Sequence, residues 1–422
     1  MKRRTAAGAI AGIAIAAALA ALPGAIPAAL AQGKTIELDF PSWQIEEPGI
    51  ADYWTELIKA FEAAHPGVKV KKQQVPFREY VEKLTVRFAG NNPPDIVHLP
   101  TRNYLAFASQ GWLAPLDVDL AQTDVKATYT KLADEMQYEG KTYGVLMMGY
   151  GMMFYYNEKM LADAKVPVPK TSDELVKAIQ ATTDVNAGRY GWGAPTNEHP
   201  NVFVEISTWV TGEGQSLFKG NQYNFTDPAV LRAIDKFRVA AKQAPKGTSS
   251  EQARQLFLDG KVSMLRDGPW VAAALKKAPD ATRPFLKMGA MPFAKVPGGT
   301  SNSLHLPAKM DPEKRKLAWD FIRMTTTPEW QAKFTTLTAS PAPRRNALSA
   351  AELAARPELA LVNKAAAESV NLFPESVAVR ENYNEFAKIF VEHGLKLVTG
   401  DRPTADVMKD LQAELNKRVP AK

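Results

Sequence analysis

An alternation of strand patterns with helix patterns near the start of the chain limits its fold more than any other feature. In TIELDF, residues 35–40, polar and apolar side chains alternate, which is typical of a half-buried strand. Apolar side chains then recur at helical spacing until Pro66 and Gly67 end the helix. Strands that alternate with helices predict a mainly parallel sheet covered by helices, and therefore an α/β fold. The series comprises predicted strands at residues 35–40, 68–70 and 93–99 and predicted helices at residues 53–67 and 80–90.

Capping residues mark the helices further along the chain. Thr171 and Glu174 form a capping box, and Asp227, Asp311 and Thr327 each precede a proline at the first helical position. Short apolar runs between these helices predict further strands. The predicted strands are residues 143–148, 152–156, 262–265 and 304–306, and the last predicted helix is residues 404–417.

The first 31 residues have the composition of a signal peptide. Three bases at residues 2–4 precede an apolar run at residues 6–22, and ALA at residues 29–31 gives a cleavage site before Gln32. A membrane anchor is the alternative, but the apolar run is short for a span and prolines follow it. The chain has no cysteine, which argues against a lipid anchor. We therefore expect a soluble protein exported to the periplasm by the Sec or the twin-arginine route.

Length and charge limit the class of protein further. Removal of residues 1–31 leaves 391 residues, which are too many for one ordinary core and predict two lobes. Without the three leader bases, 49 Lys and Arg stand against 45 Asp and Glu, a formal charge of +4. The bases are spread along the chain, so no nucleic-acid partner is predicted.

The motifs of common enzymes are missing from the sequence. The five histidines show no metal-ligand spacing, and neither HExxH nor a G-x-S-x-G elbow occurs. GKT at residues 140–142 lacks the upstream glycine of a phosphate loop. Glu46 and Glu47 are the acids most suited to a glycosidase pair, but sequence neighbours rarely face one site, and we expect them on the surface. No catalytic residue, metal or cofactor is predicted.

Several stretches follow one another in a distinctive order. They include AFEAAHPGVKV at residues 60–70, PPDIVHL at 93–99, GKTYGVLMMGYGMMFYYNEKML at 140–161 and FLDGKVSMLRDGPW at 257–270. Together they resemble the extracellular solute-binding proteins of family 1, the maltose-binding-protein-like proteins that serve carbohydrate ABC transporters. The resemblance covers essentially all of the predicted mature chain.

The resemblance implies two α/β lobes joined by a hinge, with the ligand in the cleft between them. One lobe would comprise residues 32–148 and 301–345, and the other residues 149–300 and 346–422. Gly149 and Gly151 suit a crossing between lobes, because glycine absorbs changes in backbone conformation. The implied partners are a sugar or related small molecule and the ABC permease subunits of the inner membrane, and the implied state is a monomer.

Trp270 is the strongest candidate for a ligand contact. It follows the predicted strand 262–265 and the Gly268-Pro269 turn, and ligands of α/β proteins bind beyond the carboxyl ends of strands. The resemblance implies that its indole covers the apolar face of a sugar, with core packing as the alternative. The other implied ligand residues are Trp43, Thr101, Arg102, Asn103, Tyr150, His199, Asn201, Trp209 and Tyr383, of which Trp209 and Tyr383 suit the core equally well.

Two positions depart from the maltose-binding pattern. Tyr150 and Arg102 stand where maltose-binding relatives carry acids, which disfavours maltodextrin and suits an anionic group such as a uronate or a phosphate ester. The sequence therefore predicts a periplasmic carrier for a carbohydrate-like solute. Two alternatives stay open: a carrier of a polyol or glycerol phosphate ester, and a secreted carbohydrate-active enzyme.

Overall fold

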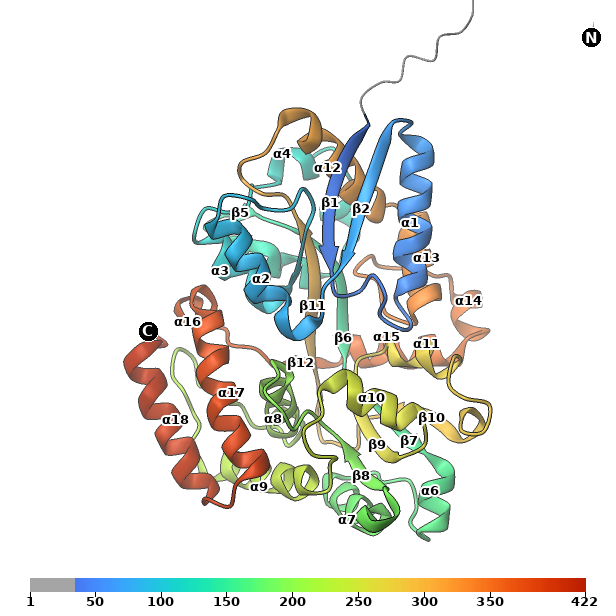
Figure 1. Ribbon diagram of the computed structural model, residues 1–422, viewed down its shortest axis with the longest axis vertical. Coiled ribbons are helices and arrows are strands. Elements are labelled where there is room, and N and C mark those ends of the chain that lie inside the picture. Colours follow the sequence, from blue (N-terminus) through green and yellow to red (C-terminus); the bar gives the residue numbers. More distant parts are fainter. Residues whose placement is uncertain (1–34) are drawn as a thin grey trace, which may run out of the picture. The chain divides into compact units, whose positions relative to one another are not determined.

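A ten-residue strand, β11 (Val296–His305), organises the first of two larger sheets (Figure 1). It pairs antiparallel with β3 (Val97–Pro100) and β6 (Val145–Gly151), and parallel with β12 (Ser369–Asn371). A separate parallel pair, β1 (Ile36–Ser42) and β2 (Val68–Gln74), lies beside β3. The structure is a computed structural model and describes residues 35–422, so the predicted signal peptide and its cleavage site lie outside the described residues.

The second sheet has the strand order β10-β7-β9-β8. Its strands are β10 (Leu286–Ala290), β7 (Met153–Asn157), β9 (Val262–Asp267) and β8 (Tyr190–Gly193). Only the β8–β9 pair is parallel, and β7 runs antiparallel to both of its neighbours. The predicted α/β class is confirmed, but the sheets are mixed rather than mainly parallel, because β11 runs antiparallel to β3 and β6, and β7 runs antiparallel to β9 and β10.

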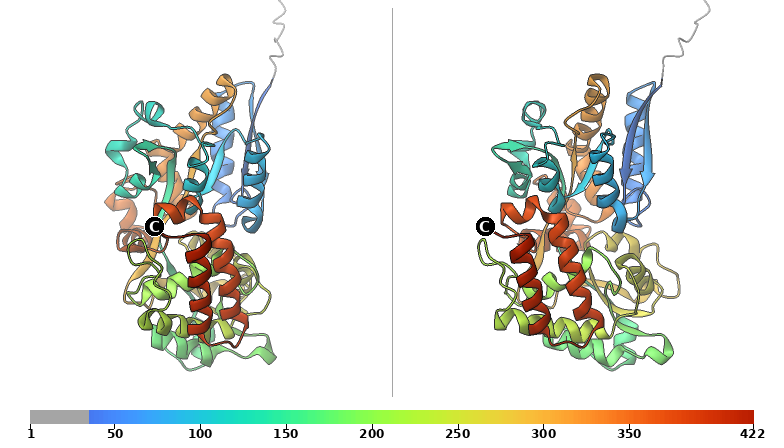
Figure 2. Two further views of the ribbon diagram at one scale, coloured as in Figure 1. Left: turned by 90° about the vertical axis from the view of Figure 1, so that its left-hand side faces the viewer. Right: turned by 60° about the vertical axis from the view of Figure 1, so that its left-hand side comes forward.

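Helices pack against both sheets, and the pair α17 and α18 lies side by side in Figures 1 and 2. The longer helices are α1 (Ala51–Ala64), α2 (Phe77–Ala89), α3 (Thr101–Ala108), α7 (Ser172–Thr182), α8 (Asn201–Gly212), α9 (Pro228–Lys242), α10 (Ser250–Leu258), α12 (Pro312–Thr325), α13 (Pro328–Thr338), α15 (Pro357–Ala367), α17 (Tyr383–Thr399) and α18 (Thr404–Arg418). The shorter helices are α4 (Asp117–Leu120), α5 (Val125–Thr128), α6 (Glu158–Asp163), α11 (Val271–Leu275), α14 (Ala350–Ala354) and α16 (Val377–Glu381). Two short strands, β4 (Gln137–Tyr138) and β5 (Lys141–Thr142), form a hairpin.

Separate apolar clusters surround the two sheets. One includes Phe40 of β1, Trp54 of α1 and Phe321 of α12, with ring centres 5.1 and 5.5 Å from Phe40. Another joins α8, α9 and α17, where Phe203 lies 4.9 Å from Phe390 in an edge-to-face contact. Within residues 35–422, no helix combines the length and apolar composition that a membrane crossing requires.

The predicted strand at residues 304–306 is the end of the much longer β11. Its earlier half, VPGGTS, has few large apolar residues, because other backbone lies very close to it. A side chain on Gly298 would place its Cβ 2.1 Å from the Tyr150 carbonyl oxygen. Likewise a Cβ on Gly151 would lie 2.3 Å from the Ala365 carbonyl oxygen, so close approach alone requires glycine at this position.

Candidate functional site

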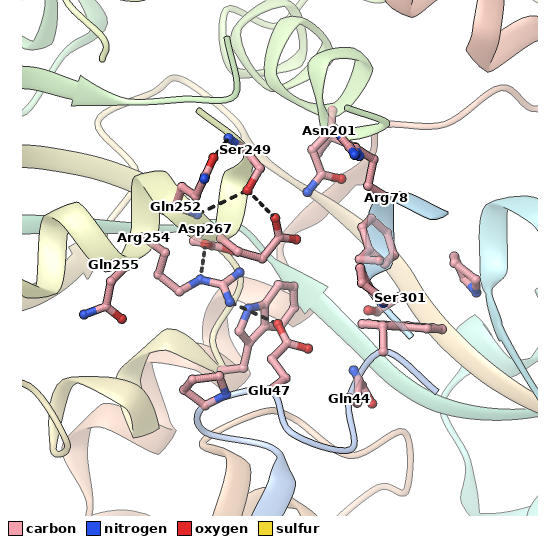
Figure 3. A pocket seen from close by; sticks show the side chains of 18 of the residues that line it. Gln44, Glu47, Arg78, Asn201, Ser249, Gln252, Arg254, Gln255, Asp267 and Ser301 are labelled. Carbon is pink, nitrogen blue, oxygen red and sulfur yellow. Dashed lines mark hydrogen bonds and ion pairs between the residues drawn. The ribbon is translucent and has the colours of Figure 1, made fainter. Parts of the chain in front are cut away.

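A cavity with a volume of about 700 Å³ receives residues from both larger sheets and the β1–α1 loop (Figure 3). Three of its walls follow the carboxyl ends of strands, which is where α/β proteins place ligands. Those walls are the loop after β1, the junction of β3 with α3, and the segment after β9. The first turns of α2, α8 and α10, together with β6 and β11, complete the lining.

Trp43 of the β1–α1 loop forms one aromatic wall. Its indole stacks on the His98 imidazole, with ring centres 4.2 Å apart and planes 14° apart. The ring edges of Phe77 and Tyr80 lie against the same indole at 5.4 and 5.0 Å. Because three rings surround it, the Trp43 side chain is fixed in place before any ligand arrives.

A chain of hydrogen bonds holds His98 beneath Trp43. Burial lowers the pKa of His98 to about 3, so the imidazole is neutral at neutral pH. Nε2–H donates to Oδ1 of Asn302 over 3.0 Å, which leaves Nδ1 to accept from the Ser42 hydroxyl over 2.8 Å. The Ser42 oxygen in turn accepts from the backbone N–H of Gln44, a residue that lines the cavity. This network fixes the floor of the site.

A charged cluster of Glu47, Arg254 and Asp267 lines the same cavity as Trp43, and Figure 3 shows its ion pairs. Nη1 of Arg254 donates to Oε1 of Glu47 over 3.0 Å, and Nε donates to Oδ2 of Asp267 over 2.9 Å. Burial raises the pKa of Glu47 to about 7, against the opposing attraction of the Arg254 charge. Carboxylate oxygens beyond those bonded to Arg254 are suited to accept hydrogen bonds from ligand hydroxyl groups.

Trp270 lines the cavity and also packs against two apolar clusters. Its ring centre lies 5.9 Å from that of Tyr150, in an edge-to-face arrangement. The Gly-Pro-Trp sequence has a steric cause, because a Cβ on Gly268 would lie 2.1 Å from the Trp270 ring. Glycine therefore allows the indole to fold back over the turn.

Six of the ten predicted ligand residues line this cavity: Trp43, Thr101, Arg102, Tyr150, Asn201 and Trp270. Burial raises the pKa of Tyr150, so its hydroxyl stays protonated and can donate a hydrogen bond. Tyr383 instead lines a smaller side chamber of about 260 Å³, which shares Thr101 and Arg102 with the main cavity.

The structure places the remaining three predicted residues outside the cavity lining. Trp209 belongs to the core instead, because its ring is fully buried and lies 5.7 Å from Trp192. His199 is also fully buried, with Nδ1 accepting from the backbone N–H of Asn201 over 3.1 Å. Asn103 donates to Oδ1 of Asn384 over 2.8 Å.

Sequence reasoning missed several cavity residues that the structure shows. Glu47 was expected on the surface, yet the turn after β1 brings it into the cavity. Asp267 ends the same strand that led to Trp270, so the strand-end rule already contained the signal for it. Arg254 is a buried base on the apolar face of α10, and a base is rarely buried unless an acid pairs with it. Other lining residues missed from the sequence are Gln44, Phe77, Arg78, Ser249, Glu251, Arg266 and Ser301.

A cavity lined by two indoles and a cluster of polar side chains is typical of a protein that binds a small molecule. Residues 56–360 match the family described as bacterial extracellular solute-binding protein. The chain belongs to this family, which confirms the resemblance seen in its sequence.

Individual relatives agree with this assignment. The diacetylchitobiose binding protein DasA of Streptomyces coelicolor is 26% identical over 404 residues, which cover 89% of each chain. A solute-binding protein of Thermotoga lettingae, solved with α-D-tagatose, has a TM-score of 0.80 at 20% identity and covers 91% of this chain and 100% of its own. A solute-binding protein of Agrobacterium radiobacter K84, solved with ribitol, has a TM-score of 0.77 at 19% identity, with coverage of 91% and 98%. The fold is therefore that of the two-lobed solute-binding proteins.

Proposed function

We propose that this protein captures a carbohydrate-like solute in the periplasm and delivers it to the permease of an ABC importer. One observation carries the proposal: Trp43 and Trp270 line the same cavity as the Glu47–Arg254–Asp267 cluster. A pyranose ring has apolar C–H faces and a rim of hydroxyl groups. Indoles suit the faces, and carboxylate and guanidinium groups suit the rim.

The proposed mechanism is closure of two lobes around the solute, without a chemical step. Residues 32–148 with 301–345 form one proposed lobe, and residues 149–300 with 346–422 form the other. The Glu47–Arg254 ion pair and the 2.6 Å hydrogen bond from the Tyr138 hydroxyl to Glu381 would then join the lobes. A permease that recognises only this closed arrangement would distinguish loaded from empty protein. In this proposal the protein acts as a monomer.

A secreted glycosidase is the second function that an observation favours. Glu47, with a pKa of about 7, has the ionisation that a general acid requires near neutral pH. Its contact with Arg254 nevertheless stabilises the charged carboxylate, which is a poorer proton donor. Incubation with a panel of aryl glycosides tests this alternative, and release of the aryl group at a rate abolished by Glu47→Gln would establish it.

A thermal-shift screen of the mature protein tests the proposed function. A ligand at one hundred times its Kd stabilises the folded state by about 2.7 kcal/mol. For a chain of this length, that stabilisation raises Tm by roughly 3 °C. The screen should contain neutral sugars, oligosaccharides, polyols, acidic sugars and glycerol phosphate esters. If no member of the panel raises Tm and none binds in calorimetry, carbohydrate capture is wrong.

A further inference from the structure

Arg102 differs from the other guanidinium groups that line the main cavity. Four arginines line this cavity. Among them, within residues 35–422, Arg102 alone has no carboxylate oxygen within 4.0 Å of its guanidinium group and donates no hydrogen bond to the protein. The other three each have an acid nearby: Arg254 has Glu47 and Asp267, Arg266 has Glu205 at 2.5 Å, and Arg78 has Glu79 at 3.8 Å.

Two aromatic rings hold the Arg102 guanidinium in place. Its central carbon lies 5.4 Å from the ring centre of Phe77 and 5.6 Å from that of Phe373. Cation–π contacts stabilise the charge through the ring faces, but they supply no hydrogen-bond acceptor to the N–H groups. The positioned side chain therefore still offers its planar set of donors to another partner.

Arg102 borders two adjoining chambers. Arg102, Thr101, Thr300 and Phe373 line both the main cavity and the side chamber of about 260 Å³. The hydroxyl of Thr300 lies 2.9 Å from that of Thr101, so polar groups lie next to the guanidinium. Burial raises the pKa of Tyr383, and the positive charge of Arg102 opposes this rise. The Tyr383 hydroxyl therefore lies close enough to Arg102 to interact with its charge.

Two bases and two acids line the side chamber, so it offers no surplus positive charge to a doubly charged ligand group. Arg380 lines it with its guanidinium carbon 5.6 Å from the Tyr104 ring centre. Glu135 and Glu375 line the same chamber, and Glu135 accepts a hydrogen bond from Thr300 over 2.7 Å. A phosphate monoester, with a charge of about −1.5 to −2, meets more repulsion from these two acids than a carboxylate does.

We propose that Arg102 recognises a carboxylate on the solute, and that the preferred ligand is an acidic saccharide of the uronic acid class. The inference rests on the proposed carbohydrate-binding function and specifies its ligand. The two N–H groups along one edge of the guanidinium match the two oxygens of a carboxylate. The sugar ring occupies the main cavity, where the indoles line the walls, and its acidic group lies at the junction with the side chamber.

The test is calorimetry with saccharides that differ only at the carboxyl group. Suitable probes are digalacturonate with its reduced neutral counterpart, and methyl glucuronide with methyl glucoside. We expect the acidic member to bind roughly tenfold to a hundredfold more tightly, and Arg102→Gln to remove that preference by weakening the acidic member far more than the neutral one. Arg232→Gln is the matched control, because this exposed base on α9 makes the same charge change away from both chambers.

A second variant and a phosphate arm keep the alternatives distinct. Arg102→Lys retains the charge but loses the planar donor set, and we expect an intermediate loss of affinity for the acidic sugar. If glucose 6-phosphate or glycerol 3-phosphate binds more tightly than any uronate, the carboxylate assignment is refuted. If neutral sugars bind as tightly as acidic ones and Arg102→Gln alters neither, the inference fails while the proposed function stands. If no saccharide of either kind binds, the proposed function itself fails.

Discussion

Replacement of Trp270 by alanine separates a ligand platform from a core residue, because this indole has contacts of both kinds. It lines the cavity beside Tyr150, and it also packs against apolar clusters on two sides. An aromatic side chain at the centre of a binding site commonly contributes about 2 kcal/mol or more to affinity. We therefore expect Trp270→Ala to raise Kd for the solute at least roughly thirtyfold.

The effect of Trp270→Ala on stability should be smaller than that of a core substitution. Trp209 provides the matched control, because its ring is fully buried and does not line the cavity. Truncation of a buried tryptophan costs about 3–5 kcal/mol of unfolding free energy. Trp270 is only partly buried, so we expect Trp270→Ala to lose about half as much.

Two measurements on each variant decide between these roles. Urea unfolding without ligand gives the free energy of unfolding, and titration calorimetry with the solute gives Kd for the folded protein. A platform role requires that Trp270→Ala binds the solute weakly and loses a moderate part of its stability. Trp209→Ala should instead lose much of its stability and keep its Kd for the solute. If Trp270→Ala is as unstable as Trp209→Ala and binds with unchanged Kd, the stacking argument is refuted.

Three further substitutions or conditions test other parts of the site. Gly268→Ala should weaken solute binding and change the intrinsic fluorescence, because its new Cβ would lie 2.1 Å from the Trp270 ring; unchanged affinity would contradict this. Arg254→Gln should lower the free energy of unfolding, measured in urea, by about 3 kcal/mol, because it leaves two buried acids unpaired. Arg189→Gln is the control: Arg189 forms an exposed pair with Asp184, so the same assay should show a change of less than about 1 kcal/mol. The contribution of His98 and His305 to stability should also fall from pH 7.5 to 5.5, because burial lowers the pKa of His98 to about 3 and that of His305 to about 4, while the unfolded chain takes up protons below about pH 6.5. Proton uptake by Glu47, whose pKa burial raises to about 7, opposes this fall, so the histidine contribution is read from the difference between the parent protein and a histidine variant. The loss should be about 1.4 kcal/mol for each histidine at pH 5.5, and a His98→Gln variant with an unaltered pH profile would count against it.

Local patterns predicted the elements well where a strand or helix has large apolar residues. The helix at residues 53–67 corresponds to α1, and the strand at residues 262–265 corresponds to β9. β11 was largely missed because its first half depends on glycines that allow other backbone to approach, rather than on apolar side chains. A periodicity argument has no means of detecting a strand of that kind.

Trp209 shows why a ligand role implied by a family resemblance is weaker evidence than the local sequence around the residue. Apolar residues occur all round α8, in VFVEISTWV, and a helix with that composition is buried on every side. The composition of this helix points to the core, whereas the sequence prediction left a core role and a ligand role equally open for Trp209. Asp267 is the opposite case, since the strand-end rule applied to it as well as to Trp270.

The partners of Glu47 were beyond sequence reasoning for a different reason. Glu47 and Arg254 are 207 residues apart, and neither position has a pattern that specifies the other. Only the assembled fold brings the β1–α1 loop against α10. The same holds for Arg102, whose ring contacts come from Phe77 near it in sequence and from Phe373 far along the chain.

The Glu47–Arg254 pair and the His98 network suit different parts of a binding cycle. The His98 network lies among β1, β3 and β11, so it keeps Trp43 in place whether or not the proposed lobes separate. The Glu47–Arg254 pair would break when the lobes open. A buried ion pair recovers in attraction roughly what it loses in hydration, so its net contribution to closure is small. We infer that contacts with the solute, rather than this ion pair, supply most of the free energy that favours the closed form.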